Sequence, residues 1–164
     1  MKTEITTRIA TLADIDVLAQ TMREGFTTYR AFTSAGWAPP PDALDRARIA
    51  DRLPRPDAWC VVAEARGAPA GHVALLDDTE PGVAYLWMLF IRTPWWGTGL
   101  AHSLHRLAVG EAARRGARAM RLVTPAAHAR ARAFYEREGW GLVGEPIWEP
   151  MLALDLVEYR RELP

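Results

Sequence analysis

Two glycines past the middle of the chain could bring an anion against the protein backbone. Gly97 and Gly99 follow the mostly apolar run from Val83 to Ile91 and precede a helical pattern. The first N–H groups of a helix have no partner inside the helix and lie at the positive end of its dipole, so this position suits a phosphate. Glycines also remove the side chains that would hold the anion away from the backbone. The unit therefore predicts a binding site for a phosphorylated small molecule.

This loop differs from the two commonest nucleotide-binding loops. A P-loop requires Lys-Ser or Lys-Thr directly after the glycines, and neither pair follows here. A dinucleotide fingerprint requires a third glycine where His102 stands, and it lies in the first strand–helix unit of its domain. Gly97-x-Gly99 satisfies only part of that pattern, so a nucleotide-dependent enzyme with a Rossmann-like loop stays as an alternative.

The loop and a second segment together resemble the GNAT superfamily of N-acetyltransferases. The acyl-CoA loop of that superfamily reads Gln/Arg-x-x-Gly-x-Gly/Ala after a long strand, which Gly99 and Ala101 match while Trp96 departs from it. A later helix of the superfamily reads Asn-x-x-Ala-x-x-Phe-Tyr-x-x-x-Gly-Phe/Trp. The segment from His128 to Trp140 fits this pattern except at its first position. Two partial motifs in the right order and spacing are more specific than either alone.

The resemblance implies a fold, a co-substrate and the residues that hold it. The implied fold is α/β (α+β), a single domain over residues 1–164 with a mixed, mostly antiparallel central sheet flanked by helices. Acetyl-CoA is the implied co-substrate, gripped by the backbone of the long strand and by the glycine loop. The implied cofactor-binding residues are Leu89, Phe90, Ile91, Trp96, Gly97, Thr98, Gly99, Leu100, Ala101, His102, His128 and Ala131.

Acetyl transfer to a primary amine makes separate demands on acid and base groups. An aliphatic amine has a pKa of about 10 and attacks a thioester only in its neutral form, so deprotonation at pH 7 costs roughly 4 kcal/mol. A general base, or a site that disfavours the ammonium form, must supply this free energy of deprotonation. An N–H group must stabilise the oxyanion that forms on the thioester oxygen. The departing thiolate must be protonated, a role that the resemblance gives to Tyr135. The rival interpretation is that Tyr135 only fills the core.

The general base is harder to assign. Members of the superfamily often carry a glutamate within the long strand, and the strand from Val83 to Ile91 has none. Glu80 flanks that strand. Glu24 lies on the first predicted helix, whose end borders the acceptor site in the superfamily. Glu80 and Glu24 are the candidates, and a water relay without a single essential base stays open.

Other polar side chains near the two motifs have competing interpretations. His102 and His105, three apart on one helix, resemble a pair of metal ligands. No carboxylate joins them at a suitable sequence spacing, so we expect no metal. His128 either reaches a CoA group or caps its helix. Arg130 and Arg132 either meet the nucleotide phosphates or face solvent.

Composition limits the kinds of partner that the protein can bind and the cellular compartment in which we expect it. The chain has 164 residues, a formal net charge of zero and a single cysteine, Cys60. We therefore expect no nucleic-acid partner and no membrane partner. The absence of an apolar segment after the first residues predicts no signal peptide, and one cysteine excludes an internal disulfide. A cytoplasmic location follows as the expectation, and a homodimer is left open.

Periodicity and breaker residues predict alternating elements along the chain. The predicted strands cover residues 8–10, 59–65, 71–76, 83–91, 120–124, 141–145 and 152–160. The predicted helices cover residues 14–26, 42–53, 97–115 and 128–138. Thr11 or Asp14 is the expected cap of the first helix.

The acceptor region is rich in aromatic residues. Residues 26–56 and the predicted loop at 146–150 contain Phe26, Tyr29, Phe32, Trp37 and Trp148. Apolar walls around few charges suit a small, partly hydrophobic amine. We predict an N-acetyltransferase that acts on a small-molecule amine by direct attack in a ternary complex. A non-catalytic acyl-CoA-binding or sensor module and a protein N-acetyltransferase are the alternatives.

Overall fold

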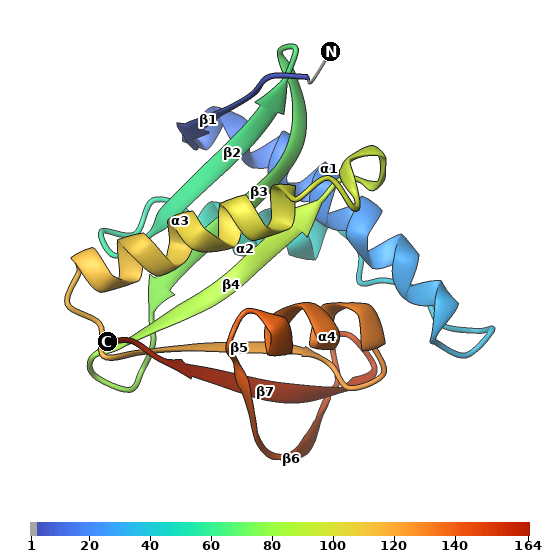
Figure 1. Ribbon diagram of the computed structural model, residues 1–164. Helices are drawn as coiled ribbons and strands as arrows, with labels where there is room; N and C mark the ends of the chain where they lie inside the picture. The colour runs from blue at the N-terminus through green and yellow to red at the C-terminus, as the bar shows by residue number, and fades with distance from the viewer. Residues whose placement is uncertain (1–2) are drawn as a thin grey trace.

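The computed structural model describes residues 3–164 and shows one twisted sheet that opens in its middle (Figure 1). The strand order is β1-β2-β3-β4-β5-β7-β6, and every neighbouring pair is antiparallel except β4 with β5. The strands are β1 (Ile5–Ile9), β2 (Trp59–Ala65), β3 (Ala68–Asp77), β4 (Val83–Ile91), β5 (Ala119–Pro125), β6 (Gly141–Glu149) and β7 (Leu154–Glu162). The predicted mixed, mostly antiparallel sheet is therefore confirmed.

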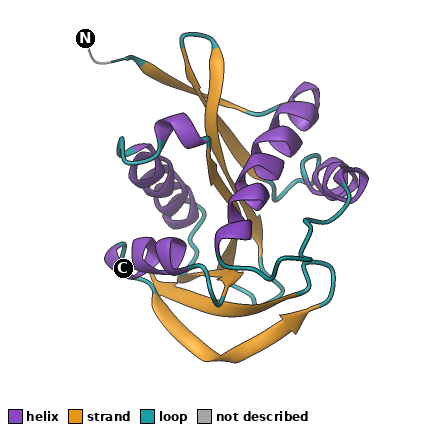
Figure 2. Ribbon diagram, turned by 90° about the vertical axis from the view of Figure 1, so that its right-hand side faces the viewer, coloured by secondary structure: helices purple, strands orange, loops and turns teal. Residues whose placement is uncertain are grey.

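Helices cover both faces of this sheet (Figures 1 and 2). Strand side chains alternate between two buried clusters, as the period of two requires. Val61 of β2 packs in one cluster with Leu104, and Val62 packs in the other with Leu18. The four helices are α1 (Ile15–Thr27), α2 (Asp42–Arg52), α3 (Leu100–Arg114) and α4 (Ala129–Arg137). No helix within residues 3–164 is long and apolar enough to cross a bilayer.

The first helix begins through a capping box. The Thr11 side chain accepts a hydrogen bond from the Ala13 N–H, and the Asp14 carboxylate accepts one from the Thr11 N–H at 2.7 Å. This box caps a 3-10 turn (Leu12–Asp14) that leads into α1, where Asp14 itself makes no cap bond. Arg8 of β1 holds the Asp14 carboxylate at 2.8 and 2.9 Å and lowers its pKa to about 2. Of the two expected caps, Thr11 is the one confirmed.

Two elements differ from their predicted bounds for backbone reasons. Helix α3 begins three residues later than predicted because Gly97 and Gly99 have φ angles of 71° and 89°, which a right-handed helix excludes. Strand β3 begins at Ala68 because Arg66 and Gly67, with φ angles of 53° and 75°, make a tight turn between β2 and β3.

The last hairpin is also longer than predicted. Strand β6 extends to Glu149, so most of the predicted loop at residues 146–150 belongs to an edge strand. Trp148 is 60% exposed there. The turn that follows does reach the acceptor aromatics, since the Trp37 indole N–H donates to the Leu152 carbonyl at 2.7 Å. The prediction that Trp148 lies in a loop at the acceptor site was wrong.

Candidate active site between two diverging strands

Strands β4 and β5 pair only over their first residues and then diverge. Their parallel pairing runs from Val83 with Ala119 to Tyr85 with Arg121. A bulge follows in β4, because Ala74 of β3 pairs with Met88 while Leu75 pairs with Leu86. Bulges bend a strand and re-aim its side chains. Among residues 3–164 no strand pairs with this edge of β4 beyond Tyr85, so its backbone groups can bind an extended ligand, except the Ile91 carbonyl, which accepts from the Trp96 indole.

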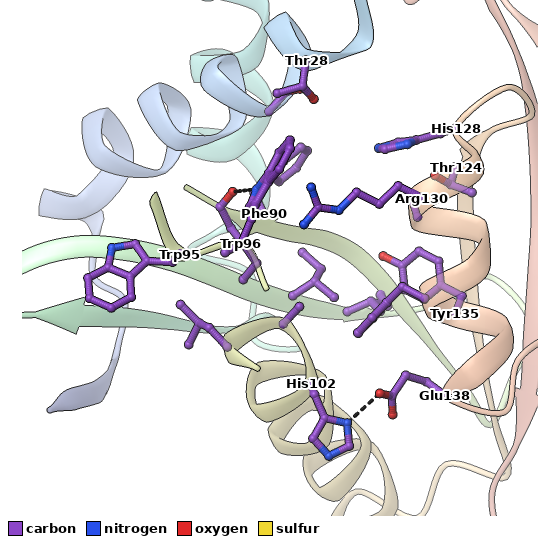
Figure 3. Close-up of a pocket in the computed structure, with 18 of the residues that line it drawn as sticks. Thr28, Phe90, Trp95, Trp96, His102, Thr124, His128, Arg130, Tyr135 and Glu138 are labelled. Atoms are coloured by element: carbon purple, nitrogen blue, oxygen red, sulfur yellow. Dashed lines mark hydrogen bonds and ion pairs between the residues drawn. The ribbon is translucent and has the colours of Figure 1, made fainter. Parts of the chain in front are cut away.

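A pocket of about 460 Å³ lies in this opening. Its walls are the free half of β4, the N-terminus of α3, one side of α4 and the end of α1 (Figure 3). The structure brings together all of the predicted cofactor-binding residues except Thr98. The Thr98 hydroxyl instead donates to the Trp95 carbonyl at 2.6 Å, within the loop.

The glycine loop has the geometry that an anion requires. Gly97 and Gly99 both have left-handed φ angles, and Gly99 is the N-cap of α3. A β carbon at either position would meet no atom within 4 Å. The glycines are therefore needed for backbone conformation and open access, not for packing. The first N–H groups of α3 lie beside this open space without partners inside the helix.

Trp96 connects the loop to both neighbouring walls. Its indole N–H donates to the Ile91 carbonyl at 2.9 Å, and the Arg130 guanidinium lies 3.7 Å from the centre of its ring. The side chain is 37% exposed. Trp96 thus links the end of β4 to α4 across the pocket. Arg132 has another role, because it donates to the Tyr159 hydroxyl at 3.0 Å and to the Ala126 carbonyl at 2.8 Å.

Tyr135 projects from α4 into the pocket (Figure 3). Its ring packs against those of Phe134 and Trp140, with centroids 5.3 and 5.9 Å away. Burial is the one cause that shifts its pKa, and no hydrogen bond to its hydroxyl contributes within residues 3–164. Burial raises the Tyr135 pKa, so the hydroxyl keeps its proton at neutral pH. A protonated hydroxyl facing a cavity can serve as a proton donor.

The two glutamates predicted as bases lie outside the pocket lining. Glu24 accepts hydrogen bonds from Arg92 at 2.9 Å and from the Thr93 N–H and hydroxyl at 2.9 and 2.8 Å. Partial burial raises its pKa, but these bonds outweigh burial and the pKa lies below its ordinary value. Glu24 therefore fastens α1 to the end of β4.

Glu80 lies at the opposite end of β4, before the strand begins. Its carboxylate accepts hydrogen bonds from Arg160 at 2.9 Å and from Arg118 at 2.8 Å. Arg160 first and then Arg118 lower the Glu80 pKa to about 2. Glu80 is thus a fixed carboxylate beside the paired part of β4 and β5, away from the pocket.

The structural role of Glu24 can be tested directly. Glu24→Gln is expected to lower the free energy of unfolding by about 1–2 kcal/mol, because the charge-assisted bond to Arg92 is lost. The Glu24 pKa is depressed in the folded state, so the wild-type advantage is present at neutral pH and is lost as the pH falls through the carboxyl range. Urea unfolding of both proteins at pH 7 and pH 4 measures this. Equal stability at pH 7 would contradict the role.

His102, His105 and Glu138 form a chain of contacts beside the pocket. Glu138 lies 2.6 Å from Nδ1 of His102 and 3.4 Å from Nδ1 of His105, so a carboxylate does join the two histidines. The Trp140 indole donates to Nε2 of His105 at 2.8 Å, which leaves the His105 proton on Nδ1. Burial lowers the His105 pKa to about 4. No cluster among the described residues has the arrangement of a metal site.

His128 lines the pocket but does not cap α4. It occupies the N-cap position, and its side chain makes no cap bond. Its ring lies 5.2 Å from that of Tyr29 and 5.0 Å from that of Phe32. The capping interpretation was therefore wrong, and the imidazole faces the acceptor aromatics.

Several lining residues were not predicted because they come from distant segments. Gly25 comes from α1, Thr28 from the 3-10 turn after it (Thr28–Ala31) and Thr124 from β5. Only Glu138 carried a usable signal, since it follows Tyr135 by three residues and so shares its side of α4.

Comparisons with known proteins agree with this architecture. The sequence model of the acetyltransferase (GNAT) family matches residues 21–140. No curated protein matches the sequence. Among solved structures, the PaiA N-acetyltransferase from Thermoplasma acidophilum in complex with coenzyme A superposes with a TM-score of 0.77 at 16% identity, over 98% of this chain and 99% of that chain.

Two further structures share the fold. The ribosomal-protein-S18-alanine N-acetyltransferase from Escherichia coli has a TM-score of 0.71 at 16% identity, over 97% of this chain and 94% of that chain. A nourseothricin acetyltransferase has a TM-score of 0.61 at 23% identity, over 66% of this chain and 67% of that chain. With the family match spanning most of its length and the diverging strands in place, this chain belongs to the GNAT family of acetyltransferases.

Proposed function

We propose that this protein moves an acetyl group from acetyl-CoA to the primary amine of a small molecule, by direct attack in a ternary complex. The observation that carries the proposal is the shared pocket of three parts: the free edge of β4, the open N-terminus of α3 and the Tyr135 hydroxyl. These parts supply a grip for an extended arm, a site for a pyrophosphate and a proton donor.

The proposed cofactor position follows from these parts. The pyrophosphate binds the N–H groups at Gly97, Gly99 and the first turn of α3, where dipole and geometry favour an anion. The pantetheine arm extends along β4 from Ile91 towards Leu89, and a strand N–H donates to the thioester oxygen as negative charge develops there. Ala131 leaves room for this arm on the α4 side.

The proposed chemistry leaves the last proton transfer to Tyr135. The neutral amine attacks the thioester carbon, and the C–S bond then breaks with its electron pair on sulfur. Tyr135 donates its proton to that sulfur. Its raised pKa keeps the hydroxyl protonated until the transfer takes place. Glu24 and Glu80 take no part in these steps, because both lie outside the pocket lining.

The acceptor class follows from the aromatic end of the pocket. Tyr29 lines the pocket there, and Phe26, Phe32 and Trp37 pack around its ring with centroids 5.2 to 6.1 Å away. Such walls favour a small, partly hydrophobic amine. A protein N-terminus is the alternative acceptor, as the name of one structural neighbour indicates for that neighbour. We further propose a cytoplasmic location, for which the single buried Cys60 is the support.

Acetyl-CoA is expected to stabilise the folded protein and to lose its acetyl group when an acceptor is present. A ligand that binds only the native state at a hundred times its Kd adds about 2.7 kcal/mol. Thermal melts with acetyl-CoA and with a dinucleotide measure binding, and thiol release with a panel of small amines measures transfer. A dinucleotide that raises the melting temperature while acetyl-CoA does not would favour the Rossmann-like alternative. Binding without amine-dependent thiol release would favour a sensor module.

A further inference from the structure

We propose that His128 is the general base that removes the proton from the attacking amine nitrogen, an inference that rests on the proposed acetyl transfer. Its imidazole is placed at the acceptor end of the same pocket wall that carries Tyr135 (Figure 3). The proposal assigns a role that neither predicted glutamate is positioned to perform.

One side of α4 presents a line of residues to the pocket. His128, Ala131, Tyr135 and Glu138 lie at intervals of three and four residues, so they follow one another along one side of the helix, and all four line the pocket. His128 is at the end that meets the acceptor aromatics Tyr29 and Phe32. Tyr135 lies two turns further on. The amine attacks the thioester carbon from one side, and the sulfur leaves on the other. A base on the acceptor side of the wall can therefore reach the amine nitrogen, and an acid further along the same wall can reach the sulfur.

The ring nitrogens of His128 are not engaged, and no hydrogen bond contributes to the shift of its pKa. Within residues 3–164 neither nitrogen has a hydrogen-bond partner, whereas His102 contacts Glu138 and His105 accepts from Trp140. The fourth histidine, His72, is buried and does not line the pocket. His102 also lines the pocket, but its Nδ1 is paired with Glu138 and it lies at the start of α3, whereas His128 lies beside the acceptor aromatics Tyr29 and Phe32.

The surroundings of the His128 ring favour its neutral form. The titratable and charged groups around the ring are Tyr29 on the 3-10 turn after α1 and Tyr135 and Arg130 on α4. Burial first, and then the Arg130 charge, lower the His128 pKa from its ordinary value. The ring is therefore neutral at pH 7 and can accept a proton. The one carboxylate in the lining, Glu138, is already paired with His102.

The proton balance closes without another reactant. The amine enters in its neutral form, its ammonium proton having passed to solvent. As the C–N bond forms, the nitrogen becomes acidic and gives one N–H proton to His128. The C–S bond breaks with its electron pair on sulfur, which takes the Tyr135 proton. One proton then passes from the His128 imidazolium to the Tyr135 phenolate through solvent, and the products are an amide and a thiol.

The test compares His128→Gln and His128→Asn with wild type in the full-length protein, using an amine that wild type acetylates. We expect kcat at pH 7 to fall roughly 100-fold in both variants, while the Kd of acetyl-CoA by calorimetry stays within about twofold of wild type. The wild-type kcat should fall on the acid side, at a pH below the ordinary imidazole range because the His128 pKa is lowered, as the imidazole becomes protonated, and this acid limb should be absent from both variants. Added imidazole should partly restore His128→Ala.

Three results would contradict the role of His128 as the general base. A variant kcat near the wild-type value with the acid limb retained would overturn it in favour of a water relay. A raised Kd of acetyl-CoA with unchanged kcat would make His128 a contact to the CoA arm instead. If the wild-type protein transfers no acetyl group at any pH, the proposed function itself is overturned. The wild-type protein is therefore assayed first, before any variant.

Discussion

Replacing Tyr135 with phenylalanine is expected to lower kcat at pH 6 to 7 by a large part of 10²–10⁴-fold, the usual worth of general acid assistance. This corresponds to about 3–5 kcal/mol of barrier. The change keeps the ring and its packing against Phe134 and Trp140, and it removes only the proton donor. The affinity for acetyl-CoA should change little. Steady-state kinetics from about pH 6 to 9, with thermal melts alongside, measure both effects.

The pH dependence and a second tyrosine separate catalysis from packing. A thiol has a pKa of about 8.5 by analogy with cysteine, so the thiolate leaves more readily unprotonated as the pH rises and the loss should shrink. Tyr85→Phe is the matched control, because Tyr85 lies on β4 under Arg121 and outside the pocket lining. It should retain the wild-type kcat. A wild-type rate for Tyr135→Phe at pH 6 would remove Tyr135 from the mechanism.

Replacing Gly99 with valine is expected to abolish acetyl-CoA binding. The φ angle of 89° at Gly99 is one that a β-branched residue hardly adopts, and the new side chain would enter the open space at the N-terminus of α3. Calorimetric titration of acetyl-CoA measures the loss. Unchanged affinity in a folded variant would move the pyrophosphate site elsewhere.

Gly116→Val provides the control for backbone strain. Gly116 lies just past the other end of α3 with a φ angle of 79°, and a β carbon there also meets no atom within 4 Å. It is outside the pocket lining. The two variants should lose similar stability, whereas only Gly99→Val should lose the ligand. Equal loss of affinity in both would show that strain in α3, not blockage of the anion site, causes the effect.

The core elements of the fold were predictable because their signals are local. The apolar run from Val83 to Ile91 and the repeat over the α4 segment lie within single elements, and the structure has both. The start of α3 was missed because it depends on the φ angles of Gly97 and Gly99, which residue types permit but do not dictate. The length of β6 was missed because it is an exposed edge strand, where no buried face imposes an alternating pattern.

The site was predictable where its residues follow one another and not where distant segments meet. The loop and α4 supply their own residues to the pocket, so a local motif located them. Glu80 precedes β4 by only a few residues, yet a strand of this length extends for about 30 Å, and Glu80 lies at its far end. Glu138 joins His102 and His105 from another helix, a contact that depends on how α3 and α4 pack.

The most direct test of acetyl transfer is the identity of the product formed from acetyl-CoA with an isotopically labelled acetyl group. Wild-type protein should be incubated with a panel of small, partly hydrophobic amines, and the products analysed by mass spectrometry and NMR. A labelled amide on the amine nitrogen is the expected product, formed together with an equal amount of free CoA and only when protein is present. Bound acetyl-CoA that yields no amide with any amine, or that yields only labelled acetate, would contradict this expectation.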